Sequence, residues 1–287
     1  MSARVRPAVD ADIEPVADLL HRLMNPKIPR ERWRRVLDYP WRPPEAERGW
    51  LVEDAGAVVG FMATIYSDRE TSVGLRRFCD LGAWYLERDY RGTGIGDELL
   101  RAGMAQLGVT YATMTARRAT GRRIRALGFT VLDATRRIFR AEAGRPGLAL
   151  RPVDEARLDE ARLDARSRRI VRDHRRLNVE MRTAGDPASP VLFVFQSKRK
   201  GADILYRELL FCSDRGFLAA EAGALAQTLC RDVSEILAVD SRFLPANFME
   251  GEREEIALPR WVRTPDVPVA DVDHLYAETL LLDLKLP

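Results

Sequence analysis

A glycine-rich segment, Arg91-Gly92-Thr93-Gly94-Ile95-Gly96, has the residue types and spacing that point most directly to chemistry. It stands between a strand-like run that ends at Leu86 and an amphipathic run, residues 99–107, with leucines and a methionine on one helical face. Glycines let the backbone approach a ligand closely and turn several N–H groups inward, and the following helix N-terminus adds partial positive charge. The segment therefore predicts an anion site, for which a pyrophosphate is the natural guest.

Two familiar phosphate motifs do not fit this loop. A dinucleotide fingerprint needs GxGxxG, and Asp97 stands at the third glycine position when the motif is read from Gly92. A P-loop needs GxxxxGK[ST], and the segment has no lysine. The spacing that does fit is Q/R-x-x-G-x-G/A, which Arg91, Gly94 and Gly96 satisfy.

Hydrophobic patterning predicts the elements that must position the loop. A helix is expected between the first and second strands, a short helix follows it, and one helix comes after each of the fourth and fifth strands. In the N-terminal half, strands are expected over 5–9, 49–53, 57–66, 77–86, 109–115, 129–132 and 137–140, and helices over 13–23, 30–37, 99–107 and 120–127.

The motif and this order of elements resemble the acyl-CoA N-acyltransferase (GNAT) superfamily over residues 1–140, including the Leu127-Gly128-Phe129 ending. The resemblance implies an α/β protein with the GNAT fold, a mixed and mostly antiparallel sheet with flanking helices. It also implies acetyl-CoA as the acyl donor. No metal is expected, because no cysteine pair has CxxC spacing and the three histidines form no zinc-ligand pattern. The alternative reading of the loop is a glycine-rich turn in another kind of α/β domain.

The resemblance implies a set of coenzyme-binding residues. Trp84, Tyr85 and Leu86, at the end of the fourth strand, are expected to pair with the pantetheine arm through their backbone and to polarise the thioester carbonyl. Arg117 stands where members of the superfamily often carry an asparagine that contacts CoA. The pyrophosphate is expected on the backbone of Arg91, Gly92, Thr93, Gly94, Ile95 and Gly96. A solvated helix face is the alternative role for Arg117 and its neighbouring arginines.

The acceptor amine needs a base, because deprotonating an alkyl ammonium of pKa about 10.4 at pH 7 costs about 4.6 kcal/mol. In some GNAT members an acid on the fourth strand, eleven residues before the motif arginine, takes this role, and that position is Asp80. Its apolar neighbours would raise its pKa toward a useful range. Glu53 and Glu87 are lesser candidates, and a water chain is the other base that stays open. The alternative roles for Asp80 are a solvent-facing strand acid and a substrate-binding group.

One position departs from the family pattern. Many members carry a tyrosine four residues before the glycine of the Gly-Phe ending, where it protonates the departing thiolate, and this sequence has Ile124 there. Tyr85 or Tyr111 could substitute. A thiol of pKa about 8.5 also leaves tolerably without a strong acid.

A stretch with two glycines and a proline, residues 141–148, separates the two halves. It predicts domains over 1–143 and 149–287.

The second half begins with a repeat of the first, since residues 150–155 repeat the pattern of residues 5–10, and a hairpin is expected over 191–196 and 204–212. We interpret it as a degenerate GNAT-like repeat, similar to a poorly characterised bacterial tandem group found in surface-polysaccharide contexts. At the loop position, residues 214–220 hold one glycine, and His174 is a candidate base. Shaping the acceptor pocket, completing the cleft and forming a homodimer are the roles open to this half.

Composition excludes several other classes. A net charge of +3, with 46 basic and 43 acidic residues interspersed, disfavours a nucleic-acid binder. The apolar run 55–66 is too short for a membrane span, and three cysteines fit a reducing, cytoplasmic setting. The sequence thus predicts transfer of an acetyl group to an amine of a small molecule, such as an amino-sugar or polysaccharide precursor. A non-catalytic acyl-CoA-binding regulatory or scaffold protein is the alternative.

Overall fold

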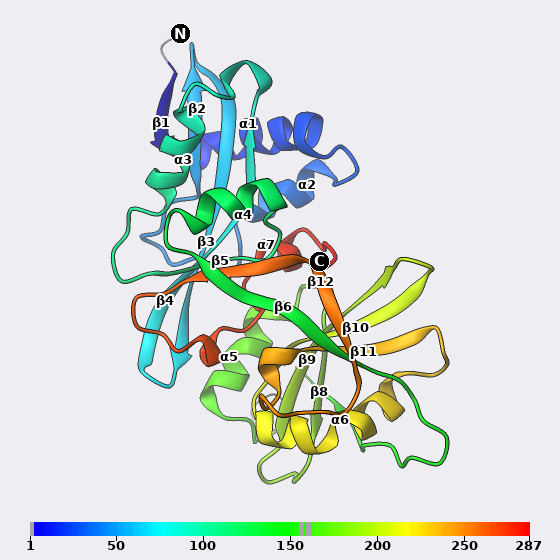
Figure 1. Ribbon diagram of the computed structural model, residues 1–287. Coiled ribbons are helices and arrows are strands. Elements are labelled where there is room, and N and C mark those ends of the chain that lie inside the picture. Colours follow the sequence, from blue (N-terminus) through cyan, green and yellow to red (C-terminus); the bar gives the residue numbers. More distant parts are fainter. Residues whose placement is uncertain (1–2, 155–157, 159–161) are drawn as a thin grey trace. The chain divides into compact units, whose positions relative to one another are not determined.

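The computed structural model describes residues 3–154, 158 and 162–287 (Figure 1). Two compact units account for the chain. Unit 1 comprises Met1–Val131, Arg260–Asp271 and Tyr276–Leu284, and unit 2 comprises Leu132–Pro259, Val272–Leu275 and Lys285–Pro287. Within the described part of the chain, no helix is both long and apolar enough to cross a membrane.

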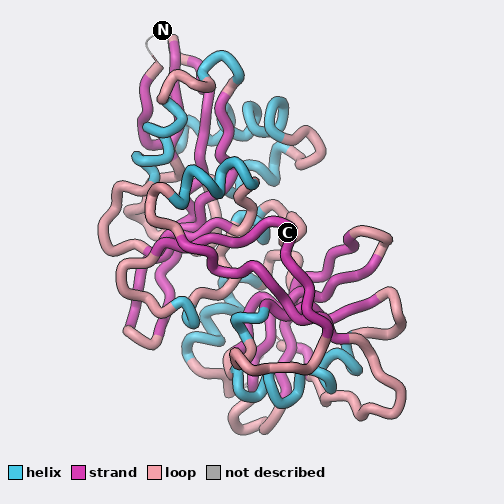
Figure 2. Tube along the Cα trace, viewed as in Figure 1, coloured by secondary structure: helices cyan, strands magenta, loops and turns pink. Residues whose placement is uncertain are grey.

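Unit 1 is built on a five-stranded run of sheet with helices beside it (Figure 2). Strands β1 to β4 pair antiparallel in chain order, and β4 then pairs parallel with β5. The strands are β1 (Arg4–Pro7), β2 (Trp50–Asp54), β3 (Ala57–Thr71), β4 (Gly74–Leu86) and β5 (Thr110–Thr113). The helices are α1 (Ile13–Leu19), which continues as a π turn over Leu20–Met24, α2 (Arg30–Trp33), α3 (Ile95–Gly103) and α4 (Arg118–Arg125).

The apolar face of α3 fixes that helix on the sheet. Leu99 and Leu100 are buried in a cluster with Met62, Tyr66 and Tyr111 of the strands. Because the helix starts directly after the glycine segment, this packing also fixes the loop that precedes it. The loop and the ends of β4 and β5 are therefore held by the core of unit 1.

Two C-terminal segments belong to unit 1, whereas the boundary expected between residues 143 and 149 places them in the second domain. Strand β12 (Glu252–Arg263) supplies Trp261–Arg263, which pair antiparallel with β5. The short helix α7 (Glu278–Leu281) begins at Glu278, and the backbone N–H of Glu278 donates to the Asp80 carboxylate on β4. Hydrogen bonds formed by distant segments thus decide the division, and local composition does not reveal them.

Unit 2 repeats the element order and strand pairing of unit 1. Strands β7 to β10 pair antiparallel in chain order, and β10 then pairs parallel with β11. Its elements are β7 (Arg151–Pro152), α5 (Ala165–His174), β8 (Glu180–Ala184), β9 (Val191–Lys200), β10 (Ile204–Cys212), α6 (Arg215–Leu229) and β11 (Glu235–Asp240). This topology is consistent with the duplication predicted from the sequence.

The two strands expected over 129–132 and 137–140 are one strand, β6 (Thr130–Phe139). Polar residues in its middle interrupt the apolar pattern, yet two of them are buried in unit 2 by ion pairing. Asp133 accepts from Arg242, and Arg136 donates to Glu208. The sequence pattern was therefore misleading at a place where paired charges replace apolar side chains.

Candidate functional site

A pocket of about 810 Å³ opens in unit 1 where β4 and β5 separate. The parallel pairing of these strands ends at Asp80 and Ala112, and the residues that follow line the pocket. Its wall is made by the ends of β4 and β5, the segments that follow them, α3, α4, the π turn after α1, and one residue each of β3 and α7. The lining residues are Leu23, Met24, Met62, Leu81, Gly82, Ala83, Trp84, Tyr85, Leu86, Arg91, Gly92, Gly94, Gly96, Asp97, Leu100, Thr113, Thr115, Ala116, Arg117, Thr120, Arg123, Ile124 and Glu278.

The glycine segment forms an open backbone loop at the start of α3. Gly92 and Gly94 have φ values of +84° and +93°, a region that favours glycine, and a Cβ at either position would meet no atom within 4 Å. Among the described residues, the N–H groups of Gly92, Thr93 and Gly94 have no hydrogen-bond partner. Such a loop fits a phosphate, because it offers backbone donors at a helix N-terminus with no side chain in the way.

Two side chains of the loop explain its conformation. Thr93 donates through its hydroxyl to the Tyr90 carbonyl (2.8 Å), and Arg91 donates through Nε to the Leu86 carbonyl (2.8 Å). Ile95 packs against the apolar core beneath the loop. Thr93 and Ile95 are not among the pocket-lining residues, and their side chains hold the loop in shape. The pyrophosphate contact expected of their backbone stays a prediction.

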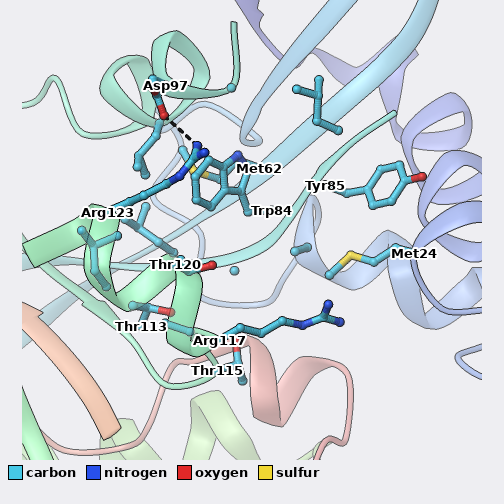
Figure 3. A pocket seen from close by; sticks show the side chains of 18 of the residues that line it. Met24, Met62, Trp84, Tyr85, Asp97, Thr113, Thr115, Arg117, Thr120 and Arg123 are labelled. Carbon is cyan, nitrogen blue, oxygen red and sulfur yellow. Dashed lines mark hydrogen bonds and ion pairs between the residues drawn. The ribbon is translucent and has the colours of Figure 1, made fainter. Parts of the chain in front are cut away.

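Arg123 in α4 and Arg117, which directly precedes this helix, have different surroundings in the structure. Arg123 donates to Asp97 at 3.0 Å, and the side chains of the two residues are 61% and 50% exposed. Figure 3 shows this pair beside Trp84, whereas the Arg117 side chain points away from it. Both arginines line the pocket, so each could receive a negatively charged group of a ligand.

The end of β4 carries an extra residue. Its pairing with β3 shifts between Gly82 and Tyr85, and Ala83 has a φ of +43°. This bulge turns the Ala83 N–H toward Glu278, whose Oε2 accepts it at 2.6 Å. The Ala83 N–H is therefore already used, and the backbone role expected of Trp84, Tyr85 and Leu86 stays a prediction.

Glu278 is a fully buried acid that the sequence analysis missed. Its Oε1 accepts from the Thr115 hydroxyl, and a Cβ on Gly82 would fall 2.2 Å from its Oε2. Burial raises the pKa of the Glu278 carboxyl, an effect that the hydrogen bonds from Thr115 and Ala83 oppose. A lone acid in the otherwise apolar run 276–282 was the one sequence signal that could have found it.

Asp80 lies next to this acid and is not a pocket-lining residue. Its Oδ1 accepts from the Glu278 backbone N–H at 2.9 Å, and its Oδ2 has no hydrogen-bond partner among the described residues. Burial, together with the Glu278 charge, raises the pKa of Asp80 well above its usual range. Asp80 therefore holds its proton more tightly than a solvent-exposed aspartate does.

Most of the other predicted residues lie at the pocket, and the lesser base candidates do not. Trp84, Tyr85, Leu86, Arg91, Gly92, Gly94, Gly96 and Arg117 all line it. Glu53 instead binds Arg6, which lowers the pKa of its carboxyl, and Glu87 is outside the lining. Ile124 lines the pocket at the usual tyrosine position, with Tyr85 as a lining tyrosine, whereas Tyr111 donates to the Gln106 carbonyl.

Unit 2 holds its candidate residues in different surroundings. His174 is buried at the end of α5 with its Nδ1 2.9 Å from the Ile170 carbonyl oxygen. Asp133, Asp240 and His274 bring ligand atoms within 4.8 Å of one another, a group that sequence spacing did not show. Arg242 donates to both oxygens of Asp133, and His274 Nε2 lies 2.5 Å from Asp240. The group is thus an ion-paired network.

The pocket beside separating parallel strands, with a glycine loop before a helix, defines an acyl-CoA N-acyltransferase type of architecture. Comparison with known families agrees, because residues 14–118 match the family described as Acetyltransferase (GNAT) family. This part of the chain is a GNAT acetyltransferase domain, and the predicted GNAT fold is confirmed.

Solved structures resemble the chain over most of its length. A GCN5-related N-acetyltransferase from Kribbella flavida aligns at 14% identity and a TM-score of 0.58, covering 92% of this chain and 72% of that one. Another from Anabaena variabilis aligns at 12% identity and a TM-score of 0.57, covering 91% and 72%. At such identities the likeness shows the fold alone. A search of curated protein sequences finds no match.

Proposed function

We propose that unit 1 transfers an acetyl group from acetyl-CoA to an amine of a small molecule. The observation that carries the proposal is the pocket itself, in which an open glycine loop, the end of β4 and a buried carboxylate meet. The loop would hold the pyrophosphate through the backbone from Arg91 to Gly96, with Arg123 and Arg117 as further cations. An amino-sugar or polysaccharide precursor is the acceptor class we retain.

The reaction follows from the placement of these groups. The amine nitrogen attacks the thioester carbonyl carbon, a C–N bond forms, and the C–S bond breaks with its electron pair on sulfur. Backbone N–H groups at Trp84 to Leu86 would stabilise the oxyanion. The buried acid pair of Asp80 and Glu278 would supply the base for the amine. Of the two protons left on a primary amine, one stays on the amide nitrogen and the other balances the proton that the departing thiolate takes up, for which Tyr85 would be the donor at the pocket wall.

Thiol release tests the proposal. Acetyl-CoA is incubated with the purified protein and a panel of amines that includes amino sugars, polyamines and aminoacyl compounds, and free CoA thiol is measured. Release that depends on an amine, with the acetylated product seen by mass spectrometry, is the expected result. Tight acetyl-CoA binding without turnover across the panel would favour the non-catalytic binding protein.

A further inference from the structure

Three features of Glu278 bear on its role: its distance in sequence from the loop, its burial and its place in the pocket wall. It lies more than 160 residues from the loop in the chain, it is only 4% exposed, and it lines the same pocket as the glycine loop. Buried carboxylates are rare without a cation beside them. Among the described residues, no arginine, lysine or histidine forms an ion pair with Glu278; its oxygens accept from a backbone N–H and a hydroxyl.

The space that Glu278 occupies is made by neighbouring residues. Gly82 has no side chain, and any Cβ there would collide with the Glu278 carboxylate and with its Cβ at 2.9 Å. The Ala83 bulge supplies one donor and Thr115 supplies the other. Both carboxylate oxygens are thus held in one orientation at the pocket wall, which is the condition for a positioned proton acceptor.

We propose that Glu278 is the catalytic base that binds the acceptor ammonium and takes its proton, and that Asp80 is a positioning residue behind it. This inference rests on the proposed function. The contact of Asp80 with the Glu278 backbone N–H fixes the start of α7, so Asp80 acts through Glu278. A buried anion with no protein cation also selects for a cationic acceptor, which is a primary or secondary amine protonated at neutral pH.

The expected protonation of Glu278 and Asp80 agrees with these two roles. Only one member of a close acid pair carries a charge comfortably in a buried site. Burial raises the pKa of both carboxyls, but Glu278 accepts two hydrogen bonds that favour its ionised form, whereas Asp80 accepts one. The proton taken from the ammonium therefore goes to Glu278, and from there to solvent through the open pocket.

The test compares Glu278→Gln with the wild type across pH. The variant keeps the size of the side chain and an acceptor oxygen for Ala83. Turnover at pH 7 is expected to fall about 10²- to 10⁴-fold, the usual contribution of general base catalysis. The deficit should shrink as pH rises toward about 10, where the amine loses its proton unaided. Acetyl-CoA affinity, measured by calorimetry, should stay within threefold of the wild type.

Two companion variants sharpen the result. Glu47→Gln removes another acid of unit 1, one whose Oε1 accepts from the Tyr66 hydroxyl at 2.7 Å and which does not line the pocket. It controls for the general cost of losing a hydrogen-bonded carboxylate and should keep the wild-type pH profile. Asp80→Asn should lose far less turnover than Glu278→Gln. Should Glu278→Gln fail to fold, Glu278→Asp takes its place, with a smaller deficit and the same pH trend expected.

Several outcomes would overturn the assignment. They are a Glu278→Gln turnover within threefold of the wild type, a deficit that is constant with pH, and a larger loss in Asp80→Asn than in Glu278→Gln. In each case an active wild type leaves the proposed function standing. Absence of turnover in the wild type with every amine would instead remove the proposed function and this inference together.

Discussion

The two units build the same order of strands and helices but treat the junction between the fourth strand and its helix differently. In unit 1 the helix α3 has Gly94 at its N-cap, and the one side chain at its first N–H groups is the neutral Thr93, whose Oγ1 lies 3.5 Å from the Ile95 nitrogen. In unit 2 the helix α6 starts at Asp214, whose carboxylate accepts from the Phe217 N–H at 2.9 Å. A negative side chain thus occupies in unit 2 the place where unit 1 offers room for a bound anion.

A second difference concerns the acid at the last parallel pair. Asp80 holds this position in unit 1 and Glu208 in unit 2. Glu208 binds Lys200 at 2.6 Å and Arg136 at 3.1 Å, so its charge is neutralised. Asp80 contacts a backbone N–H and lies beside another acid. Among the described residues, the same topological position thus holds an ion-paired acid in unit 2 and an acid without an ion pair in unit 1.

The bulge after this acid also has a different neighbour in each unit. The extra residue is Ala83 on β4 and Leu210 on β10. The Ala83 N–H donates to the Glu278 carboxylate, whereas the Leu210 carbonyl accepts from the His274 backbone N–H at 3.1 Å. Only the first arrangement places an ionisable side chain at the bulge. The shared fold therefore does not by itself place an ionisable side chain at the bulge.

The largest effect expected from this comparison is on stability in unit 2. Glu208→Gln removes the anion that the half-buried Lys200 shares with the buried Arg136, which keeps Glu254, and losing one partner of a buried ion pair costs about 3–5 kcal/mol. Urea unfolding would measure the change. A loss below about 1 kcal/mol would show that the pairing of Glu208 is not structural.

Gly82→Ala should disturb unit 1 next most strongly. The new Cβ meets the Glu278 carboxylate and Cβ, so the acid must move away from Ala83 and Thr115. We expect a loss of about 1–3 kcal/mol in unfolding free energy, together with a fall in turnover. Gly216→Ala, at a helix start in unit 2 with its nearest atom at 3.3 Å, is the matched control. Unchanged turnover in Gly82→Ala would separate Glu278 from the chemistry.

Asp80→Asn is expected to stabilise the protein at neutral pH. The pKa of Asp80 is raised in the folded state, so the folded protein binds a proton more tightly than the unfolded chain does. The contribution of the Asp80 carboxyl to the free energy of unfolding is therefore largest below about pH 3.9, its pKa in the unfolded chain. This contribution falls as pH rises above that value. Asparagine stays neutral and keeps an acceptor for the Glu278 N–H. The difference in Tm between variant and wild type should therefore grow from pH 4 to pH 8, and a constant or reversed difference would contradict the raised pKa.

Arg123→Ala should give the smallest effect. The exposed pair with Asp97 contributes little to folding, since such pairs are worth about 0–1 kcal/mol. Loss of one cation at the loop should weaken acetyl-CoA binding by about 1 kcal/mol, roughly fivefold. Arg122→Ala, at an exposed neighbouring position outside the pocket lining, should leave the affinity unchanged. Equal losses in both variants would mean that net charge, and not this position, governs the affinity.

Sequence reasoning reached the parts of unit 1 that depend on local pattern. The loop, the helix after it and the hairpin β2–β3 follow from glycine spacing and apolar periodicity, which are set by neighbouring residues. The acid pair does not follow from such patterns, because Asp80 and Glu278 are separated by 198 positions. The same is true of β6, whose buried Asp133 and Arg136 look like a break in a strand until Arg242 and Glu208 are placed beside them.

The most direct test of the account is a calorimetric titration of acetyl-CoA into the wild type, Gly94→Trp and Gly56→Trp. Both glycines have positive φ, and both have open space around a Cβ, but Gly56 lies in the turn between β2 and β3, outside the pocket lining. Both variants therefore carry similar backbone strain. Binding to the wild type and to Gly56→Trp, with loss in Gly94→Trp, is the predicted result. A folded wild type that binds no acetyl-CoA, or a Gly94→Trp variant that binds it as well as the wild type does, would contradict the account.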